Sequence, residues 1–327
     1  RANSSQRDEW SCAAGRIVLF NCRAAILRVA FVPLLAAIVS LLFVVSACPA
    51  ERRPHIVTSF FPIYGWTASV AGEHAVVENL LSARAEPHDY AFTPSDARKL
   101  GQADLIVVNG LGLESWLPRF LRGSPSSRAR ILDVSAGLGA RLIVGEHGHG
   151  HGEHDETAHA NPHVWLDPQF AAHGVSNILF VLQRIDPAHR AVYASNATAY
   201  VARLRKLDED IRQSLAGAPN RAIVTWHDAF PYLARRYELE IAGVVEEVPD
   251  VNPTPKYLSR LGRMMRERGI RVIFLAPGGQ TRLARQIASD LRVELVELDT
   301  LESGPLSPSA YEERMRHNAA VLQKHLK

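Results

Sequence analysis

From residue 55 onward, short runs of β-branched and apolar residues alternate with segments of helical periodicity, and this alternation restricts the chain to an α/β fold. Eight strands are predicted, at His55–Ser59, Ala75–Leu81, Leu105–Asn109, Arg130–Asp133, Ala222–Trp226, Glu240–Val245, Arg271–Leu275 and Glu294–Leu298. Helical patterns lie at Pro62–Ala71, Pro94–Gly101, Ser115–Leu121, Ala229–Tyr237, Thr254–Arg268, Arg282–Leu291 and Pro308–Leu326. Strands that alternate with helices form parallel sheets, so each half is expected to contain a four-stranded parallel sheet.

A long helix is predicted between the two halves. Asp186 is a suitable N-cap, Pro187 suits the first helical position, and helix-favouring residues continue to about residue 216. Apolar residues recur there mostly three and four positions apart, at Val192, Tyr193, Tyr200, Val201, Leu204, Leu207, Ile211 and Leu215. A helix of this length spans roughly 44 Å. The fold class is therefore α/β, with two (β/α)4 lobes at 48–186 and 217–327 joined by one long rigid helix at 187–216.

Composition excludes several classes of protein. The chain is 47% hydrophobic and 22% charged, which is typical of a globular protein and argues against disorder. Its net charge of +3, without a dense basic stripe, argues against a nucleic-acid partner. The three cysteines are Cys12, Cys22 and Cys48, all near the N-terminus. A transition metal held by the lobes must therefore bind histidine, carboxylate or water.

Residues 1–47 are interpreted as a targeting segment. Arg16, Arg23 and Arg28 precede an uncharged apolar run at 29–47, which ends in Val-Ser-Ala before Cys48. This ending resembles the lipobox of bacterial lipoproteins, in which the cysteine is acylated and becomes the mature N-terminus. A retained transmembrane anchor is the alternative, since 19 apolar residues can cross a bilayer. We expect an extracytoplasmic or periplasmic protein held on the membrane by a lipid anchor at Cys48.

Three histidines occupy equivalent places in the predicted topology. His88, His163 and His227 each lie where a strand or loop leads into a new helix. In open α/β sheets, ligands bind at the carboxyl ends of the strands, which is where these residues are expected. A single histidine at such a junction is usually a capping or hydrogen-bonded polar residue. Three of them, in lobes without cysteine, indicate a metal site.

A second histidine group lies in the segment 146–159, at His147, His149, His151, His154 and His159. Alternating glycine and histidine is typical of metal-binding tracts. Weak capture of several metal ions is one interpretation, and a solvated loop without a role in uptake is the other.

Five segments resemble the TroA-like or ZnuA-like metal-binding proteins of ABC importers (cluster A-I), and the resemblance covers about residues 55–325. They are EPHDYAFTPSD (86–96), ADLIVVNGLGLESWL (103–117), NPHVWLDP (161–168), HDAFPYLARRYEL (227–239) and LDTL with YEERMRHN (298–318). The resemblance implies two (β/α)4 lobes joined by one long helix, with the metal between them. It also implies an ABC permease and ATPase as partners, and we expect a monomer.

The resemblance assigns His88 and His163 as ligands from the first lobe, and His227 and Asp299 as ligands from the second. Histidine at the third position resembles zinc-type members, whereas manganese-type members carry glutamate there. Three imidazoles and one carboxylate suit Zn²⁺ better than Mn²⁺. Water in place of Asp299 is left open as the fourth ligand. The chain departs from the family at 275–280 and at Trp226. Neither departure removes a ligand, but the resemblance does not predict the residues that surround the ligands or the closure of the cleft.

Other functions remain as alternatives at this point. A zinc hydrolase would also use three histidines, but no H-E-x-x-H motif occurs and no glutamate is spaced as a general base, so we do not expect an enzyme. A manganese-binding protein, a periplasmic zinc chaperone or an adhesin could be built on the same fold.

Overall fold

The computed structural model describes residues 52–88, 90–123, 129–144, 160–246 and 252–326. Residues 53–327 form one unit, and the fold described below belongs to it. Among the described residues, no helix has the length and apolar character to cross a membrane. The apolar run at 29–47 and Cys48 lie outside the described residues.

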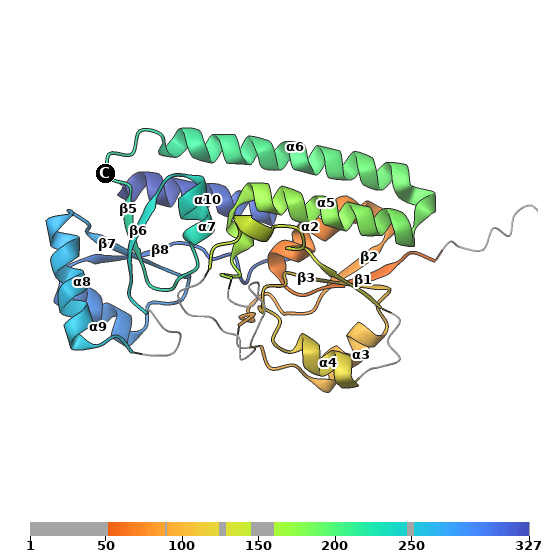
Figure 1. Ribbon diagram of the computed structural model, residues 1–327, viewed down its shortest axis with the longest axis horizontal. Helices are drawn as coiled ribbons and strands as arrows, with labels where there is room; N and C mark the ends of the chain where they lie inside the picture. Colours follow the sequence, from red (N-terminus) through yellow and green to blue (C-terminus); the bar gives the residue numbers. More distant parts are fainter. Residues whose placement is uncertain (1–51, 89, 124–128, 145–159, 247–251, 327) are drawn as a thin grey trace, which may run out of the picture. The chain divides into compact units, whose positions relative to one another are not determined.

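The first lobe is built on a parallel sheet with the order β2-β1-β3-β4. Its strands are β1 (His55–Thr58), β2 (Val76–Asn79), β3 (Leu105–Val108) and β4 (Arg130–Asp133). Its helices are α2 (Phe61–Ala71), α3 (Pro94–Gly101), α4 (Leu117–Gly123) and α5 (Pro168–Ile185). In Figure 1, α2 and α5 lie on one side of this sheet and α3 and α4 on the other. Helices on both faces explain why β3 is apolar at every position and fully buried.

The second lobe repeats this plan with the order β6-β5-β7-β8, again entirely parallel. Its strands are β5 (Ala222–Thr225), β6 (Glu240–Val244), β7 (Val272–Leu275) and β8 (Glu294–Glu297). Its helices are α7 (Pro231–Arg236), α8 (Pro255–Glu267), α9 (Arg282–Leu291) and α10 (Ala310–His325). All eight predicted strands are confirmed, with no end shifted by more than two residues.

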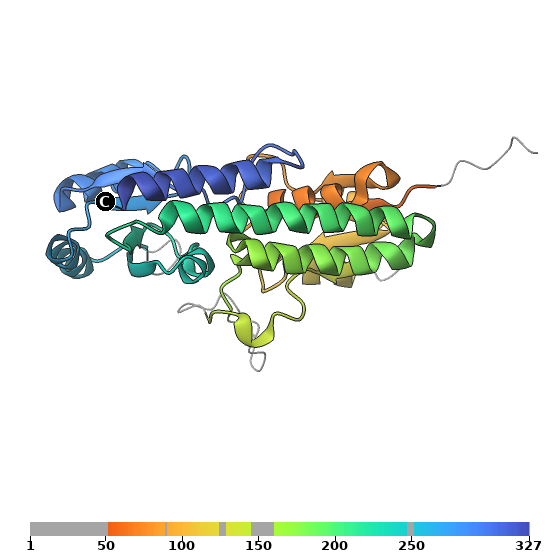
Figure 2. The ribbon, with the colours of Figure 1, turned by 90° about the horizontal axis from the view of Figure 1, so that it is seen from above.

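The predicted long helix is present as α6 (Arg190–Leu215), preceded by a 3₁₀ turn at Pro187–His189. It packs against α2 and α5 of the first lobe and against α10 of the second (Figures 1 and 2). Its buried residues follow the predicted apolar spacing: Tyr193, Ala197, Tyr200, Leu204, Leu207, Asp208, Ile211 and Leu215. Val192 was expected on this face but is exposed.

One continuous core lies beneath α6. Buried residues of β1 and β3, of α6, and of α10 belong to the same hydrophobic cluster, so the core crosses from one lobe to the other. A smaller cluster at Leu138, Val164, Phe170 and Tyr232 joins residues of both lobes near the base of the histidine-rich segment. A shared core of this kind makes α6 a stiff connection instead of a flexible linker.

Capping residues begin the helices that follow the loops carrying His88 and His163. Thr93 and Asp96 form a reciprocal capping box at the start of α3, five residues after His88. The Asp167 side chain accepts a hydrogen bond from the Gln169 backbone N–H, and Pro168 is the first residue of α5. These caps fix where each loop ends, and so restrict where His88 and His163 can lie.

Candidate metal centre

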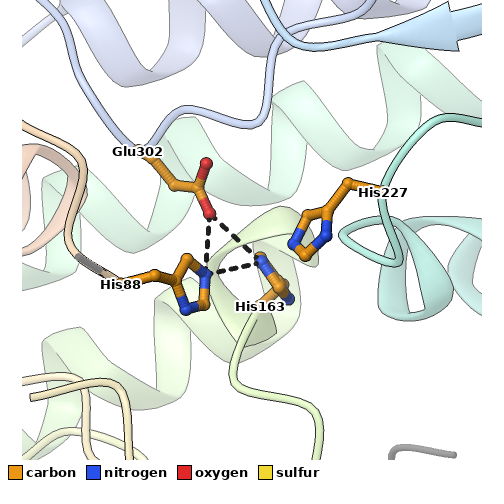
Figure 3. A group of neighbouring side chains, drawn as sticks. All are labelled: His88, His163, His227 and Glu302. Atoms are coloured by element: carbon orange, nitrogen blue, oxygen red, sulfur yellow. Dashed lines mark hydrogen bonds and ion pairs between the residues drawn. The ribbon is translucent and has the colours of Figure 1, made fainter. Parts of the chain in front are cut away.

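Four side chains from both lobes converge at the carboxyl ends of the two sheets. They are His88, which follows β2, His163, which precedes α5, His227, which follows β5, and Glu302, which follows β8. Each offers one potential ligand atom, and these four atoms all lie within 4.8 Å of one another. Figure 3 shows the three imidazoles and the carboxylate pointing toward a common centre. The structure therefore brings together all three predicted histidines.

Three of the separations are close to the edges of a metal-coordination tetrahedron. The Nε2 atoms of His88 and His163 are 3.3 Å apart, and Glu302 Oε1 lies 3.1 Å from the first and 3.2 Å from the second. Ligands held at about 2.0–2.1 Å from a tetrahedral Zn²⁺ lie about 3.3–3.4 Å from one another. The His227 ring completes the group, with its centroid 5.2 Å from that of His163 and 5.8 Å from that of His88.

Asp299, the predicted fourth ligand, does not lie in this group. Its Oδ2 accepts a hydrogen bond from Arg314 of α10, and its Oδ1 accepts one from the Leu301 backbone N–H at 2.8 Å. Asn318 bonds both the backbone N–H and the backbone carbonyl of Asp299. Both carboxylate oxygens are thus engaged, so the assignment of Asp299 is corrected: the carboxylate at the centre is Glu302.

Glu302 is aimed by the turn that Asp299 begins. Thr300 donates its hydroxyl to Glu302 Oε2 at 2.7 Å, which leaves Oε1 to face the histidines. Leu301 is fully buried and has a φ of 59°, in the left-handed region that leucine rarely adopts. Such backbone strain persists only where surrounding contacts hold it, and here it reverses the chain so that Glu302 points inward. The sequence signal that could have found this residue is a second carboxylate in the same loop, three positions after Asp299.

One hydrogen bond joins the turn that carries His163 to the turn that carries Glu302, and a second joins the turn that carries His163 to α10. The Trp165 indole N–H donates to the Thr300 carbonyl at 2.7 Å, and the Tyr311 hydroxyl donates to the Trp165 carbonyl at 2.7 Å. Trp165, Thr300 and Tyr311 are all buried. The segments that bring His163 and Glu302 together are therefore held in place by direct contacts between the two lobes.

Burial and charge set the protonation states that metal binding requires. Burial lowers the pKa of His163 and outweighs the nearby Glu302 carboxylate, which acts in the opposite direction. Burial by itself would raise the pKa of Glu302, but the neighbouring imidazoles of His163 and His88 outweigh it and hold that pKa well below its usual value. A neutral imidazole and an ionised carboxylate are the forms that bind a metal ion.

The remaining predicted residues lie away from this centre or outside the described part of the chain. His147, His149, His151, His154 and His159 fall within 145–159, outside the described residues. Trp226 donates its indole N–H to Glu246 at 3.1 Å and packs against the second-lobe cluster. The unusual residue before His227 is thus accommodated within its own lobe.

Comparison with known proteins agrees with the fold. The family model described as "Zinc-uptake complex component A periplasmic" matches residues 56–325. The high-affinity zinc uptake system protein ZnuA of Bacillus subtilis is 32% identical over 261 residues, which cover 79% of this chain and 81% of that protein. The zinc-binding lipoprotein AdcA of Streptococcus pneumoniae strain R6 is 31% identical over 280 residues, 83% of this chain and 55% of that protein. The chain thus spans only about half of the AdcA relatives.

A solved structure shares the architecture. The crystal structure of Zn(II)-bound AdcA from Streptococcus pneumoniae has a TM-score of 0.69 at 28% identity, covering 84% of this chain and 58% of that one. The match of the family model extends over both lobes and all four converging residues. The chain belongs to the periplasmic zinc-uptake component A family.

Proposed function

We propose that this protein is the extracytoplasmic zinc-binding component of an ABC importer, which captures Zn²⁺ and delivers it to a membrane permease driven by an ATPase. The observation that carries the proposal is the convergence of three imidazoles and one carboxylate from two lobes at one point. Three imidazole nitrogens and a single carboxylate oxygen are a donor set that suits four-coordinate Zn²⁺. The relatives named as zinc uptake and zinc-binding proteins support the same cargo.

The proposed ligands are His88, His163, His227 and Glu302. Four protein ligands fill a tetrahedral ion and leave no position for a water nucleophile, which a hydrolytic zinc site needs. A closed site between two lobes fits capture and release of the ion. The family is one of zinc uptake and not an enzyme family, and this agrees with the donor set.

Metal analysis of the protein tests this function. Protein purified without added metal should contain zinc, and after chelation it should bind one Zn²⁺ tightly per chain in a calorimetric titration. Simultaneous substitution of His88 and His163 by alanine should abolish the tight phase. Protein that binds no Zn²⁺, or binds it equally well without these histidines, would contradict the proposal.

We further propose that Cys48 carries the lipid anchor and that the chain acts as a monomer beside its permease. A lipoprotein name among the relatives supports the anchor. Two acyl chains on one residue give stable membrane attachment. Mass spectrometry of the mature protein should find an acylated N-terminal Cys48, and retention of residues 29–47 would indicate a transmembrane anchor instead.

A further inference from the structure

Asn161 occupies a buried position between the two ligand-bearing loops, and its side chain contacts both. It precedes His163 by two residues and is 5% exposed. Its Oδ1 accepts hydrogen bonds from the His163 backbone N–H at 3.0 Å, and lies 2.8 Å from His163 Nδ1. Its Nδ2 lies 2.8 Å from the Asp228 carbonyl and 3.2 Å from Asp228 Oδ2. Asp228 follows His227, so one amide group links His163 to the loop that carries His227.

The partners of Asn161 determine which way its amide is turned. The His163 backbone N–H can only donate, so the atom that faces it must be the oxygen. The Asp228 carbonyl can only accept, so the atom that faces it must be the NH₂ group. Both partners agree on one orientation.

This orientation fixes the tautomer of His163. Because Asn161 Oδ1 is an acceptor, His163 Nδ1 must carry the proton that is shared between them. In a neutral imidazole, Nε2 then has a free lone pair, and Nε2 is the atom that faces His88 and Glu302. The His163 ring is held in the form that can bind a metal before any metal arrives.

The same residue is tied to the second lobe through its backbone. The Tyr232 hydroxyl of α7 donates to the Asn161 carbonyl at 2.8 Å and accepts from the Ile143 backbone N–H at 3.0 Å. Tyr232 is fully buried. Asn161 is therefore held from the second lobe at its carbonyl as well as at its amide group.

We propose that Asn161 is a positioning residue that presents His163 and His227 to zinc as a preassembled pair, one imidazole from each lobe. It sets the His163 tautomer through Oδ1 and holds the His227 loop through Nδ2. This inference rests on the proposed zinc binding at the four-residue centre. Loss of an outer hydrogen-bond partner of a metal ligand lowers affinity by roughly 10- to 100-fold. Asn161→Ala removes both contacts and should fall at the upper end of that range.

Asn161→Asp separates the two contacts. The aspartate has nearly the same shape and keeps an acceptor for His163 Nδ1–H, but it has no NH₂ group and places a carboxylate against the Asp228 carbonyl and carboxylate. We expect a loss of zinc affinity of about 10-fold, smaller than in Asn161→Ala, because the contact with His163 is kept and only the tie to Asp228 is lost. Wild-type affinity in Asn161→Asp would overturn that tie, and wild-type affinity in Asn161→Ala would overturn the whole inference.

Asn177→Ala is the matched control. Asn177 of α5 is half-buried and donates its side-chain amide to the Val134 and Ala136 carbonyls at 3.1 and 3.0 Å, away from the four-residue centre. It should lose stability in the same way as Asn161→Ala but keep wild-type zinc affinity. Reduced zinc affinity in this control would show that general destabilisation explains the effect.

A direct reading of the tautomer completes the test. Long-range ¹H–¹⁵N NMR spectra of the metal-free wild type should show His163 protonated on Nδ1 alone, and Asn161→Ala should show both tautomers. A single Nδ1–H tautomer in Asn161→Ala would overturn the role of Oδ1. Failure of the wild-type protein to bind Zn²⁺ would instead contradict the proposed function, so the two failures are distinguishable.

Discussion

At the scale of single residues, two carboxylates three positions apart have different tasks. Asp299 is bonded to Arg314, to the Leu301 N–H and to Asn318, and so it builds the turn after β8. Glu302 is buried, and its Oε1 faces the histidines. A carboxylate already paired with a guanidinium is a poor ligand, because the metal must compete with an existing charge partner.

Substitutions at these two positions should therefore affect different properties, zinc affinity at Glu302 and stability at Asp299. Glu302→Gln should lower zinc affinity by more than the roughly 10- to 100-fold expected for an outer hydrogen-bond partner, because a negative ligand becomes a neutral amide. Asp299→Asn should keep zinc affinity but lower the free energy of unfolding by about 1–3 kcal/mol, since Arg314 loses its charged partner. Competition with a chelating dye and denaturant unfolding measure the two effects. Loss of zinc affinity in Asp299→Asn alone would restore Asp299 as the ligand.

At the scale of secondary structure elements, one arginine joins three helices. Arg236 of α7 donates to both oxygens of Asp208 on α6, and its Nε lies 3.8 Å from Asp167 Oδ1 at the start of α5. Asp208 is buried on the face of α6 that packs against the lobes. The pair therefore connects the long helix to the second lobe and to the loop that carries His163.

This ion pair has a defined dependence on pH. Burial by itself would raise the pKa of Asp208, but the hydrogen bond and charge of Arg236 outweigh it and lower that pKa. The unfolded chain has the ordinary aspartate pKa of about 3.9. A carboxylate whose folded pKa is the lower one stabilises the fold above about pH 4, and this contribution is lost as the pH falls through the folded value.

Arg236→Gln should lower the free energy of unfolding by about 3 kcal/mol at pH 7, because it leaves a buried carboxylate with only the more distant Arg212 as a charged partner. The difference from wild type should shrink below about pH 4, where Asp208 becomes protonated in the variant. Denaturant unfolding of the metal-free proteins at both pH values tests this. Arg268→Gln, which breaks an exposed pair with Glu240, is the control and should have a much smaller effect. An equal loss in both variants would contradict the role of burial.

At the scale of the whole molecule, the residues that flank the histidine-rich segment 146–159 lie side by side. Val144 and Ala160 form an antiparallel bridge, and the Asn161 N–H donates to the Ile143 carbonyl at 2.8 Å. Because the two ends of the segment lie side by side, it can be replaced by a short linker without moving them apart. The four proposed ligands all lie outside it.

Replacement of residues 146–159 by a short glycine linker should leave the tight zinc site unchanged and reduce the total zinc bound per chain. A glycine-rich segment loses much conformational entropy when it is ordered, so it should contribute only weak sites. Calorimetric titration of the wild type and the deletion variant separates the tight and weak phases. Disappearance of the tight phase would show that the segment supplies a ligand.

Metal selectivity also belongs to the whole site. Zn²⁺ should bind more tightly than Mn²⁺, by on the order of 100-fold or more. Imidazole ligands suit Zn²⁺, and Mn²⁺ has the lowest affinity among the divalent first-row transition metals. His227→Glu replaces one nitrogen donor by an oxygen donor and should reduce the difference in affinity between Zn²⁺ and Mn²⁺. Affinities for both metals can be measured by calorimetry in the two proteins. Equal affinities in the wild type would favour a manganese importer.

Most of the architecture could be predicted because it depends on local patterns. The β-branched runs and the three-and-four spacing in α6 depend only on which residues are neighbours along the chain, and both were confirmed. The three histidines could be found because each lies in a loop that leads into a helix, at the carboxyl end of a parallel sheet. Parallel topology by itself brings such positions together.

The sequence by itself determined the fold class and the three converging histidines, and only the tertiary structure decided the fourth position. Asp299 and Glu302 are equivalent carboxylates in sequence terms, since both follow the last strand within four residues. The choice depends on Arg314, which lies on a different element and neutralises Asp299, and on the left-handed Leu301, which turns Glu302 inward. The bond from Asn161 to Asp228 likewise joins residues 67 positions apart. Such contacts form between distant segments, so no local pattern in the sequence records them.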